Sequence, residues 1–185
     1  LLQLLCKISA SQISFVKAYL INEKGDTLKG EIKINPKKEQ DYHNKVFFKD
    51  EQGIQKNYKP SKVKGYGFNN NNYLSMDCDD EKKFYKVIAK GEISLYKMIF
   101  EEVNMNEVNY VADYFLQREG DKKMIDVKPN KFKKQLQEMM SGSASYASDY
   151  TGEKELDETS AAQVINAYNT RSKWSQKTHL KNFFF

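Results

Sequence analysis

The chain has 185 residues, of which 39% are hydrophobic and 13% aromatic, and it carries 30 Lys and Arg against 25 Asp and Glu. This composition is too aromatic for a disordered chain, and the length allows one domain to bury its own core. Only Arg118 and Arg171 are arginines, and the lysines are interleaved with acidic residues, which indicates a solvated surface and argues against a nucleic-acid reader. Cys6 and Cys78 are the only cysteines, so no disulfide framework is expected.

Residues 1–11 (LLQLLCKISAS) form a short apolar stretch that ends in the small residues Ser9, Ala10 and Ser11. This pattern is typical of the end of a signal peptide, and the stretch is too short to span a bilayer. We therefore interpret residues 1–11 as a signal-peptide remnant and expect an exported protein. The alternative is an ordinary first strand or helix.

Residues 12–128 predict an antiparallel β-domain built from hairpins. Apolar residues alternate with polar ones, and turn residues such as Glu23-Lys24-Gly25-Asp26 separate the runs. The expected hairpins join 15–22 with 27–34, 45–48 with 54–58, and 84–89 with 92–100, and further strands are expected at 63–68, 108–116 and 124–127. Residues 92–100 are apolar on both faces, which predicts a central strand. Gly65 and Gly67 indicate a bulge or a close backbone approach, and residues 69–72 are expected to form a loop.

Residues 129–170 predict a two-helix appendage, because the spacing of apolar residues changes there. Phe132, Leu136, Met139 and Met140 follow a helical period after Pro129, and a second helix is expected from about 157 to 168. Residues 141–151 are expected to be a loop and residues 171–185 a tail. The predicted fold class is mainly β (β-rich α+β): an antiparallel sheet, arranged as a sandwich or a partly open barrel, followed by two short C-terminal helices.

No pattern of catalytic or metal-binding residues emerges from the sequence. His43 and His179 lack the spacing of a zinc site. Asp77, Asp79 and Glu81 alternate as calcium ligands do, but the loop glycine and the distal glutamate are missing, so a solvated acidic turn is the better interpretation. The segment 142–146 departs from the G-x-S-x-G motif of hydrolases. We therefore expect no enzyme, no metal and no cofactor.

Aromatic residues are more frequent than a core of this size requires. Most are expected to pack inside, and a minority could line an exposed patch that binds a glycan, a peptide or a protein. Tyr66, Phe68 and Tyr73 are the candidate residues of this binding patch.

The order of the motifs resembles the N-terminal β-domain of envelope and outer-membrane-associated proteins of Bacteroidota. A "xxGDTLxGxI" hairpin (Lys24 to Ile32) is followed by "FKDExGxxKxYKPxxVKGYGF" (Phe48 to Phe68), "FYKVIAKGEISLYK" (Phe84 to Lys97), "YFLQREGD" (Tyr114 to Asp121) and the "INAYN" helix (Ile165 to Asn169). This resemblance covers residues 14–170. It implies a location at the outer membrane and a β-rich fold, and it implies no catalytic residue. Members with an outer-membrane barrel have many more residues after this domain than the 16 that follow Asn169 here.

Three function hypotheses follow. The leading hypothesis is a non-enzymatic interaction or accessory module in the periplasm or at the outer-membrane surface, with other envelope proteins as partners, no nucleic acid and no membrane span. The first alternative is a carbohydrate- or peptide-binding β-domain. The second is a hydrolase that uses strand carboxylates such as Glu92, Glu101 and Glu102.

Overall fold

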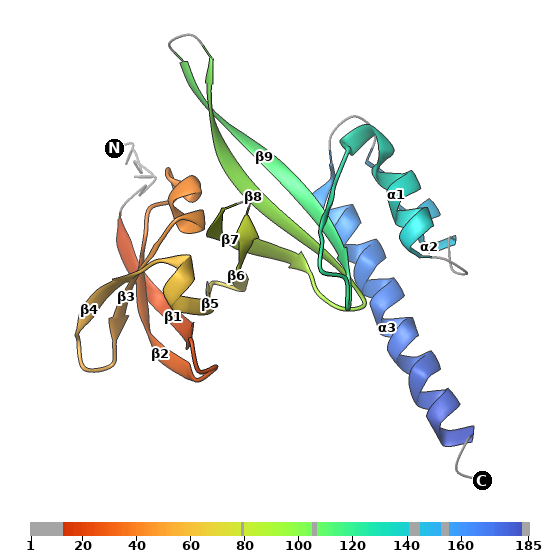
Figure 1. The fold of residues 1–185 in the computed structure, drawn as a ribbon, viewed down its shortest axis with the longest axis horizontal. Helices are drawn as coiled ribbons and strands as arrows, with labels where there is room; N and C mark the ends of the chain where they lie inside the picture. Colours follow the sequence, from red (N-terminus) through yellow and green to blue (C-terminus); the bar gives the residue numbers. More distant parts are fainter. Residues whose placement is uncertain (1–12, 79, 105–106, 141–144, 153–155, 183–185) are drawn as a thin grey trace, which may run out of the picture. The chain divides into compact units, whose positions relative to one another are not determined.

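The computed structural model describes residues 13–78, 80–104, 107–140, 145–152 and 156–182, with backbone only for residues 145 and 172–182. These residues form ten strands, and every strand pair in the described part of the chain is antiparallel. Three helices follow the strands (Figure 1). The prediction of a mainly β chain built from hairpins, with helices at its C-terminal end, is confirmed. Backbone contacts divide the chain into two compact units after Phe84.

The first unit is an open antiparallel sheet with the strand order β6-β5-β1-β2-β3-β4. Its elements are β1 (Ser14–Asn22), β2 (Thr27–Ile34), η1 (Glu39–His43), β3 (Val46–Asp50), β4 (Gln55–Tyr58), η2 (Pro60–Lys62), β5 (Val63–Phe68) and β6 (Asn71–Cys78). The predicted β1–β2 and β3–β4 hairpins are confirmed. Pro60 begins the corner that leads into β5, where its missing N–H breaks no ladder. Strand β1 lies between β2 and β5, so the sheet of this unit depends on a strand pairing between residues far apart in the sequence.

The two spaced glycines of β5 permit close packing against their neighbours. A Cβ on Gly67 would lie 2.5 Å from the Tyr19 ring, and a Cβ on Gly65 would lie 2.4 Å from the carbonyl oxygen of Tyr73. The β1–β5 register also shifts at Ile21 and Asn22, opposite this strand. Both expectations for the glycines, a close approach and an irregular register, are therefore confirmed.

Strand β6 was not predicted from the sequence, because its polar start resembles a loop. Only Asn69 and Asn70 form the turn, with φ angles of 45° and 63°. Two residues with positive φ make the two-residue hairpin turn whose twist matches the flanking strands, and asparagine tolerates this conformation better than most residues do. Asn71 and Asn72 already pair with Phe68 and Gly67. The expected loop at 69–72 is thus a tight turn of two residues followed by a strand.

The second unit combines an open sheet of order β7-β8-β9-β10 with three helices. Its elements are β7 (Glu81–Ala89, which begins in the first unit), β8 (Ile93–Asn104), β9 (Glu107–Arg118), β10 (Ile125–Asp126), η3 (Pro129–Lys131), α1 (Phe132–Met139), α2 (Ser145–Ser148) and α3 (Glu158–Asn182). The predicted central position of β8 is confirmed by its pairing with β7 and β9. Both predicted helices are confirmed. A third, short helix, α2, lies within residues 141–151, which were expected to be a loop, and α3 continues to Asn182, through residues that were expected to be a tail.

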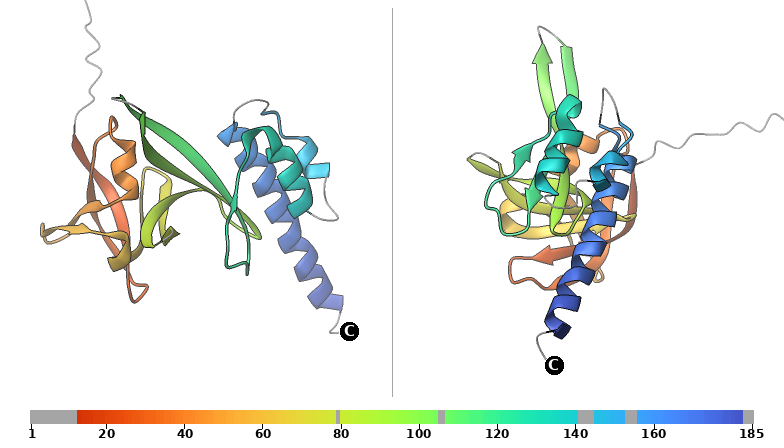
Figure 2. Two further views of the ribbon diagram at one scale, coloured as in Figure 1. Left: turned by 45° about the horizontal axis from the view of Figure 1, so that its top comes forward. Right: turned by 90° about the vertical axis from the view of Figure 1, so that its right-hand side faces the viewer.

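The helices cover one face of β8 and β9 near one end of these strands (Figures 1 and 2). Ile93 and Leu95 from β8 and Leu116 from β9 join one apolar core with residues of all three helices. From the helices, the fully or largely buried residues of this core are Phe132, Leu136, Met139, Ala147, Ala161, Val164, Ile165 and Tyr168. Burial of this apolar face is the main force that holds the helices on the sheet.

Candidate interaction site

The three aromatic residues predicted as a binding patch lie together, but they lie in the core of the first unit. Tyr66 is 1% exposed, Tyr73 2% and Phe68 8%. The Tyr66 and Tyr73 rings are stacked with centroids 4.8 Å apart, and the Tyr66 hydroxyl donates a hydrogen bond to the carbonyl oxygen of Tyr42. Burial raises the pKa of both phenols. The structure therefore gives these rings a role in packing and leaves them little surface to offer a ligand.

The acidic turn after β6 is engaged in ion pairs with neighbouring lysines. Asp77 pairs with Lys82 at 3.3 Å, and Glu81 pairs with Lys83 at 2.6 Å. Asp79 lies outside the described residues, as do Gly142, Ser143 and Ala144 of the segment weighed as a nucleophile motif. In the described part of the chain, no group of His, Cys, Asp and Glu side chains is arranged to hold a metal ion.

The remaining sequence candidates do not come together. Glu92 accepts a hydrogen bond from the Tyr168 hydroxyl at 2.8 Å, whereas Glu101 and Glu102 are exposed further along β8. Nδ1 of the buried His43 lies 2.6 Å from the carbonyl oxygen of Phe84, and Cys78 is a partly buried free thiol. The structure thus assembles no pair of strand carboxylates from these residues.

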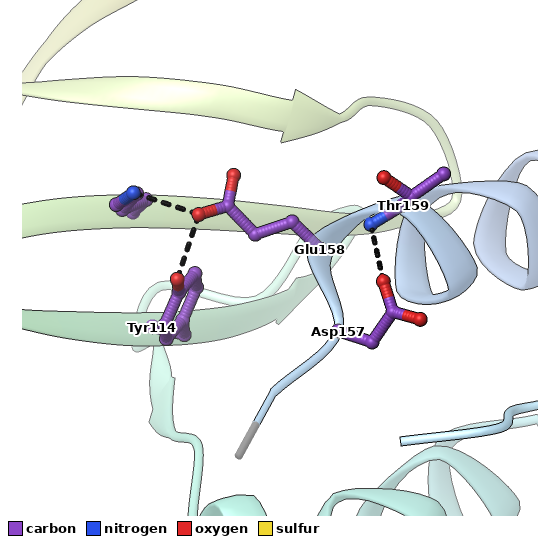
Figure 3. A network of polar contacts seen from close by, with 5 residues as sticks. Tyr114, Asp157, Glu158 and Thr159 are labelled. Carbon is purple, nitrogen blue, oxygen red and sulfur yellow. Dashed lines mark hydrogen bonds and ion pairs between the residues drawn. The ribbon is translucent and has the colours of Figure 1, made fainter.

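A polar network ties the start of α3 to the ribbon formed by β8 and β9 (Figure 3). One carboxylate oxygen of Glu158 accepts hydrogen bonds from Lys97 Nζ and from the Tyr114 hydroxyl, each at 2.7 Å. Burial disfavours the charged carboxylate, but these hydrogen bonds and the charge of Lys97 outweigh it, so the pKa of Glu158 lies below its usual value. Asp157 caps the helix by accepting from the backbone N–H groups of Thr159 and Ser160.

A second polar contact ties α3 to the start of β8. The Asn169 side chain accepts a hydrogen bond from the Ile93 N–H at 2.9 Å and donates one to the Ile93 carbonyl at 2.8 Å. Asn169 is 5% exposed and Ile93 is fully buried. This side chain therefore satisfies both backbone groups of Ile93 in the same way that a neighbouring strand would.

Beyond the Glu158 network, the ribbon continues without cover from the helices of its own unit (Figures 1 and 2). The β8–β9 pairing is continuous from Ile93 opposite Arg118 to Asn104 opposite Glu107, without a register shift. We call residues 99–104 and 107–113 the distal ribbon. Its exposed apolar side chains are Val103 (65%), Tyr110 (52%), Val108 (50%) and Val111 (41%).

The apolar face of the distal ribbon is the continuation of the face that the helices cover. Side chains alternate between the faces of a strand, and Leu95, Lys97 and Val103 lie on one face of β8. Their partners on β9 are Leu116, Tyr114 and Val108. Tyr110 lies on the same face between the last two, opposite Glu101 of β8, which shares this face. Leu95 and Leu116 are buried under the helices, whereas Val103, Val108 and Tyr110 are exposed. Large exposed apolar side chains gathered on one element mark interaction surfaces.

The distal ribbon is also acidic in a basic chain. Residues 98–117 contain Glu101, Glu102, Glu107 and Asp113 and no Lys or Arg, although the chain has 30 basic residues. Burial is the first cause that raises the pKa of the Asp113 carboxyl, and the neighbouring Asp126 carboxyl adds to it. This surface therefore combines exposed apolar side chains with negative charge.

The distal ribbon was not predicted from the sequence, because residues 101–107 have the composition of a connection between two strands. Charged side chains and asparagines dominate there, and such residues are typical of loops. One signal was present in the sequence, namely a stretch of 20 residues without Lys or Arg (98–117) in a lysine-rich chain.

Comparison with family models, with curated proteins and with solved structures finds no match to this chain. Within the described residues, no helix has both the length and the apolar character needed to cross a membrane.

Proposed function

We propose that this chain is a non-enzymatic interaction module of the cell envelope, exported to the periplasm or the outer-membrane surface, and that it binds a partner protein through the distal ribbon. The observation that carries the proposal is the exposure of Val103, Val108 and Tyr110 on a face that, nearer the helices, is buried core. The apolar, signal-like residues 1–11 and the resemblance to Bacteroidota envelope proteins support the location.

A comparison of two surface variants tests the interaction. In the ribbon variant, Val103, Val108 and Tyr110 are replaced by Ser. In the control variant, Leu28 (38% exposed) and Ile54 (54%) of the first unit are replaced by Ser, which removes a similar kind of exposed apolar side chain from another place. Both variants are first checked for folding by circular dichroism.

The tagged chain and both variants are then used to capture proteins from an envelope extract of the source organism, with identification by mass spectrometry. We expect a protein that the original chain and the control variant retain and that the ribbon variant loses. Once purified, the captured protein should bind the original chain and the control variant with similar affinity, and the ribbon variant more weakly. If the ribbon variant captures and binds as well as the original chain, the distal ribbon is not the interaction surface.

The location has its own test. Cell fractionation should place the protein with the periplasm or the outer membrane, and its mature N-terminus, read by mass spectrometry, should follow the small residues Ser9, Ala10 and Ser11. A protein found only in the cytoplasm with residues 1–11 retained would overturn the proposed export, whatever the result of the binding experiment.

A further inference from the structure

The outer edge of β9 has no strand beside it along most of its length. In the described part of the chain, β9 has β8 on one side and β10 on the other, and β10 pairs only with Leu116 and Phe115. One more bond runs from the Val127 N–H to the Tyr114 carbonyl at 2.8 Å. Residues 107–113 therefore form an open strand edge. Residues 99–104 of β8 form a second open edge on the opposite side of the pair, because in the described part of the chain β7 pairs with β8 only at Leu95, Tyr96 and Lys97.

The register identifies which backbone groups point outward along this edge. In an antiparallel pair, residues that exchange both backbone hydrogen bonds alternate with residues whose N–H and C=O point away from the partner strand. The Tyr114 carbonyl accepts from Val127 on the β10 side, so Tyr114 belongs to the outward-pointing set. Because the β8–β9 register has no shift, Ala112, Tyr110 and Val108 belong to this set as well.

The β9 edge carries two acidic side chains, Glu107 and Asp113, but lacks the other features that usually prevent strand addition. Natural edge strands are protected by lysines, prolines, bulges or short length. Strand β9 has 12 residues and a continuous register, and it contains no lysine or proline. On β9, Val108, Tyr110 and Ala112 lie on one face, and Glu107 and Asp113 lie on the other together with Asn109 and Val111.

We propose that the β9 edge at residues 107–113 accepts an extended segment of a partner protein as an added strand, in which apolar residues alternate with Lys or Arg. Apolar side chains of that segment would lie beside Val108 and Tyr110, and its basic side chains would lie beside Glu107 and Asp113. This inference rests on the proposed function and specifies the class of partner. A second copy of this chain fits the edge poorly, because self-pairing would bring these carboxylates together across the new strand pair.

The direct test uses a monomeric synthetic nine-residue peptide in which valine or threonine alternates with lysine. It is titrated into the full-length ¹⁵N-labelled chain, and amide shifts and hydrogen exchange are followed by NMR. At saturation, we expect exchange at the Val108, Tyr110 and Ala112 amides to slow by about tenfold or more, because added backbone bonds protect outward N–H groups. The Asn109 and Val111 amides, which face β8, should change much less.

Modified peptides separate strand addition from contact through side chains. Two versions carry N-methyl groups on alternate residues, so that each version blocks one edge of the peptide. We expect one version to bind and the other to fail, whereas equal binding of both would overturn strand addition. A peptide with glutamate in place of each lysine should not bind, and binding equal to that of the lysine peptide would overturn the proposed basic specificity.

Two proline variants give the matched control in the protein. Val108→Pro removes an N–H that points outward from β9, and Ile99→Pro removes an N–H that points outward from β8, on the opposite edge of the same pair. We expect the first variant to lose peptide binding and the second to keep it, with both folded by circular dichroism. If Val108→Pro binds the peptide normally, the edge is not the site.

The outcomes distinguish this inference from the proposed function. If the lysine peptide does not bind while partner capture still depends on Val103, Val108 and Tyr110, the strand-addition inference fails and the interaction module stands. If neither depends on the ribbon, both fail. A concentration-dependent dimer that the Val108→Pro change abolishes, measured by analytical ultracentrifugation, would overturn the choice of a foreign partner.

Discussion

Replacement of Asn169 by Ala should destabilise the second unit by far more than a typical surface substitution does. The change removes two hydrogen bonds from α3 and leaves the N–H and C=O of Ile93 buried without these partners. Each buried polar group left unsatisfied costs about 1–3 kcal/mol, so for two groups we expect a loss of roughly 2–6 kcal/mol in the free energy of unfolding. That is a large fraction of the ~5–15 kcal/mol that holds a typical domain together.

Urea denaturation followed by circular dichroism measures this loss, and hydrogen exchange locates it. The Ile93 amide, which donates to Asn169, should lose its protection in the variant before residues elsewhere in the sheet do. Asn166→Ala is the matched control, because Asn166 is exposed on the same helix and the same substitution there should be neutral or slightly stabilising. If Asn169→Ala unfolds within about 0.5 kcal/mol of the original chain, the contact with Ile93 contributes little and the reasoning is refuted.

Asn169→Asp gives a version of this test that depends on pH. A carboxylate can accept from the Ile93 N–H but cannot donate to the Ile93 carbonyl, which lies 2.8 Å from the present amide nitrogen. The variant should therefore be at least as unstable as Asn169→Ala at neutral pH. In acid, the stability of Asn169→Asp should rise relative to that of Asn169→Ala, because a protonated carboxyl group can donate a hydrogen bond to the Ile93 carbonyl.

Three further substitutions test other contacts by denaturation. Glu158→Gln should lower stability by roughly 1–3 kcal/mol at neutral pH. Because the folded-state pKa of Glu158 is depressed, its stabilising contribution is present above the unfolded-state pKa and is lost as pH falls through the folded-state pKa. The stability difference from the original chain should therefore shrink in acid, and a difference that stays constant with pH would contradict the network with Lys97. Gly67→Ala should cost about 1–3 kcal/mol, because its Cβ would meet the Tyr19 ring, and a smaller cost in a Tyr19→Ala background would confirm that clash. Phe132→Ala, in the core under the helices, should cost about 3–5 kcal/mol, and a loss below about 1 kcal/mol would show that this site is not tightly packed.

The elements that could be predicted from the sequence are those whose signal is local. Alternating residues around the turn at Gly25 predict the β1–β2 hairpin, and the helical spacing after Pro129 predicts α1. The same local signals failed for β6, because Asn71 and Asn72 look like part of a polar loop although they already pair with β5. The position of β1 beside β5 has no local signal either, since it depends on packing between residues distant in the sequence.

The candidate site was harder to predict than the fold, because exposure depends on what lies over each face. Tyr66 and Tyr110 are both tyrosines in strands, yet one is 1% exposed and the other 52%. The difference arises because other core side chains cover Tyr66, including Phe84, whose ring centroid lies 4.9 Å from that of Tyr66. Tyr110 lies instead on the part of the β8–β9 ribbon beyond the helices. The frequency of aromatic residues therefore does not indicate which of them are exposed. In this chain the stretch 98–117 without Lys or Arg is the better sequence signal for the distal ribbon.

The position of β1 between β2 and β5 also determines when the first unit can form during synthesis. The hairpin of β1 and β2 is complete at Ile34, but the other edge of β1 has no partner until β5 ends at Phe68. At about 5–20 residues per second, the growing chain would carry this unpaired edge for roughly 2–7 seconds. A chain released before Phe68 would keep that edge exposed permanently, and an exposed strand edge pairs readily with other chains. Ribosome-bound fragments that end before residue 68 should therefore be more prone to aggregate than a chain whose first unit is complete.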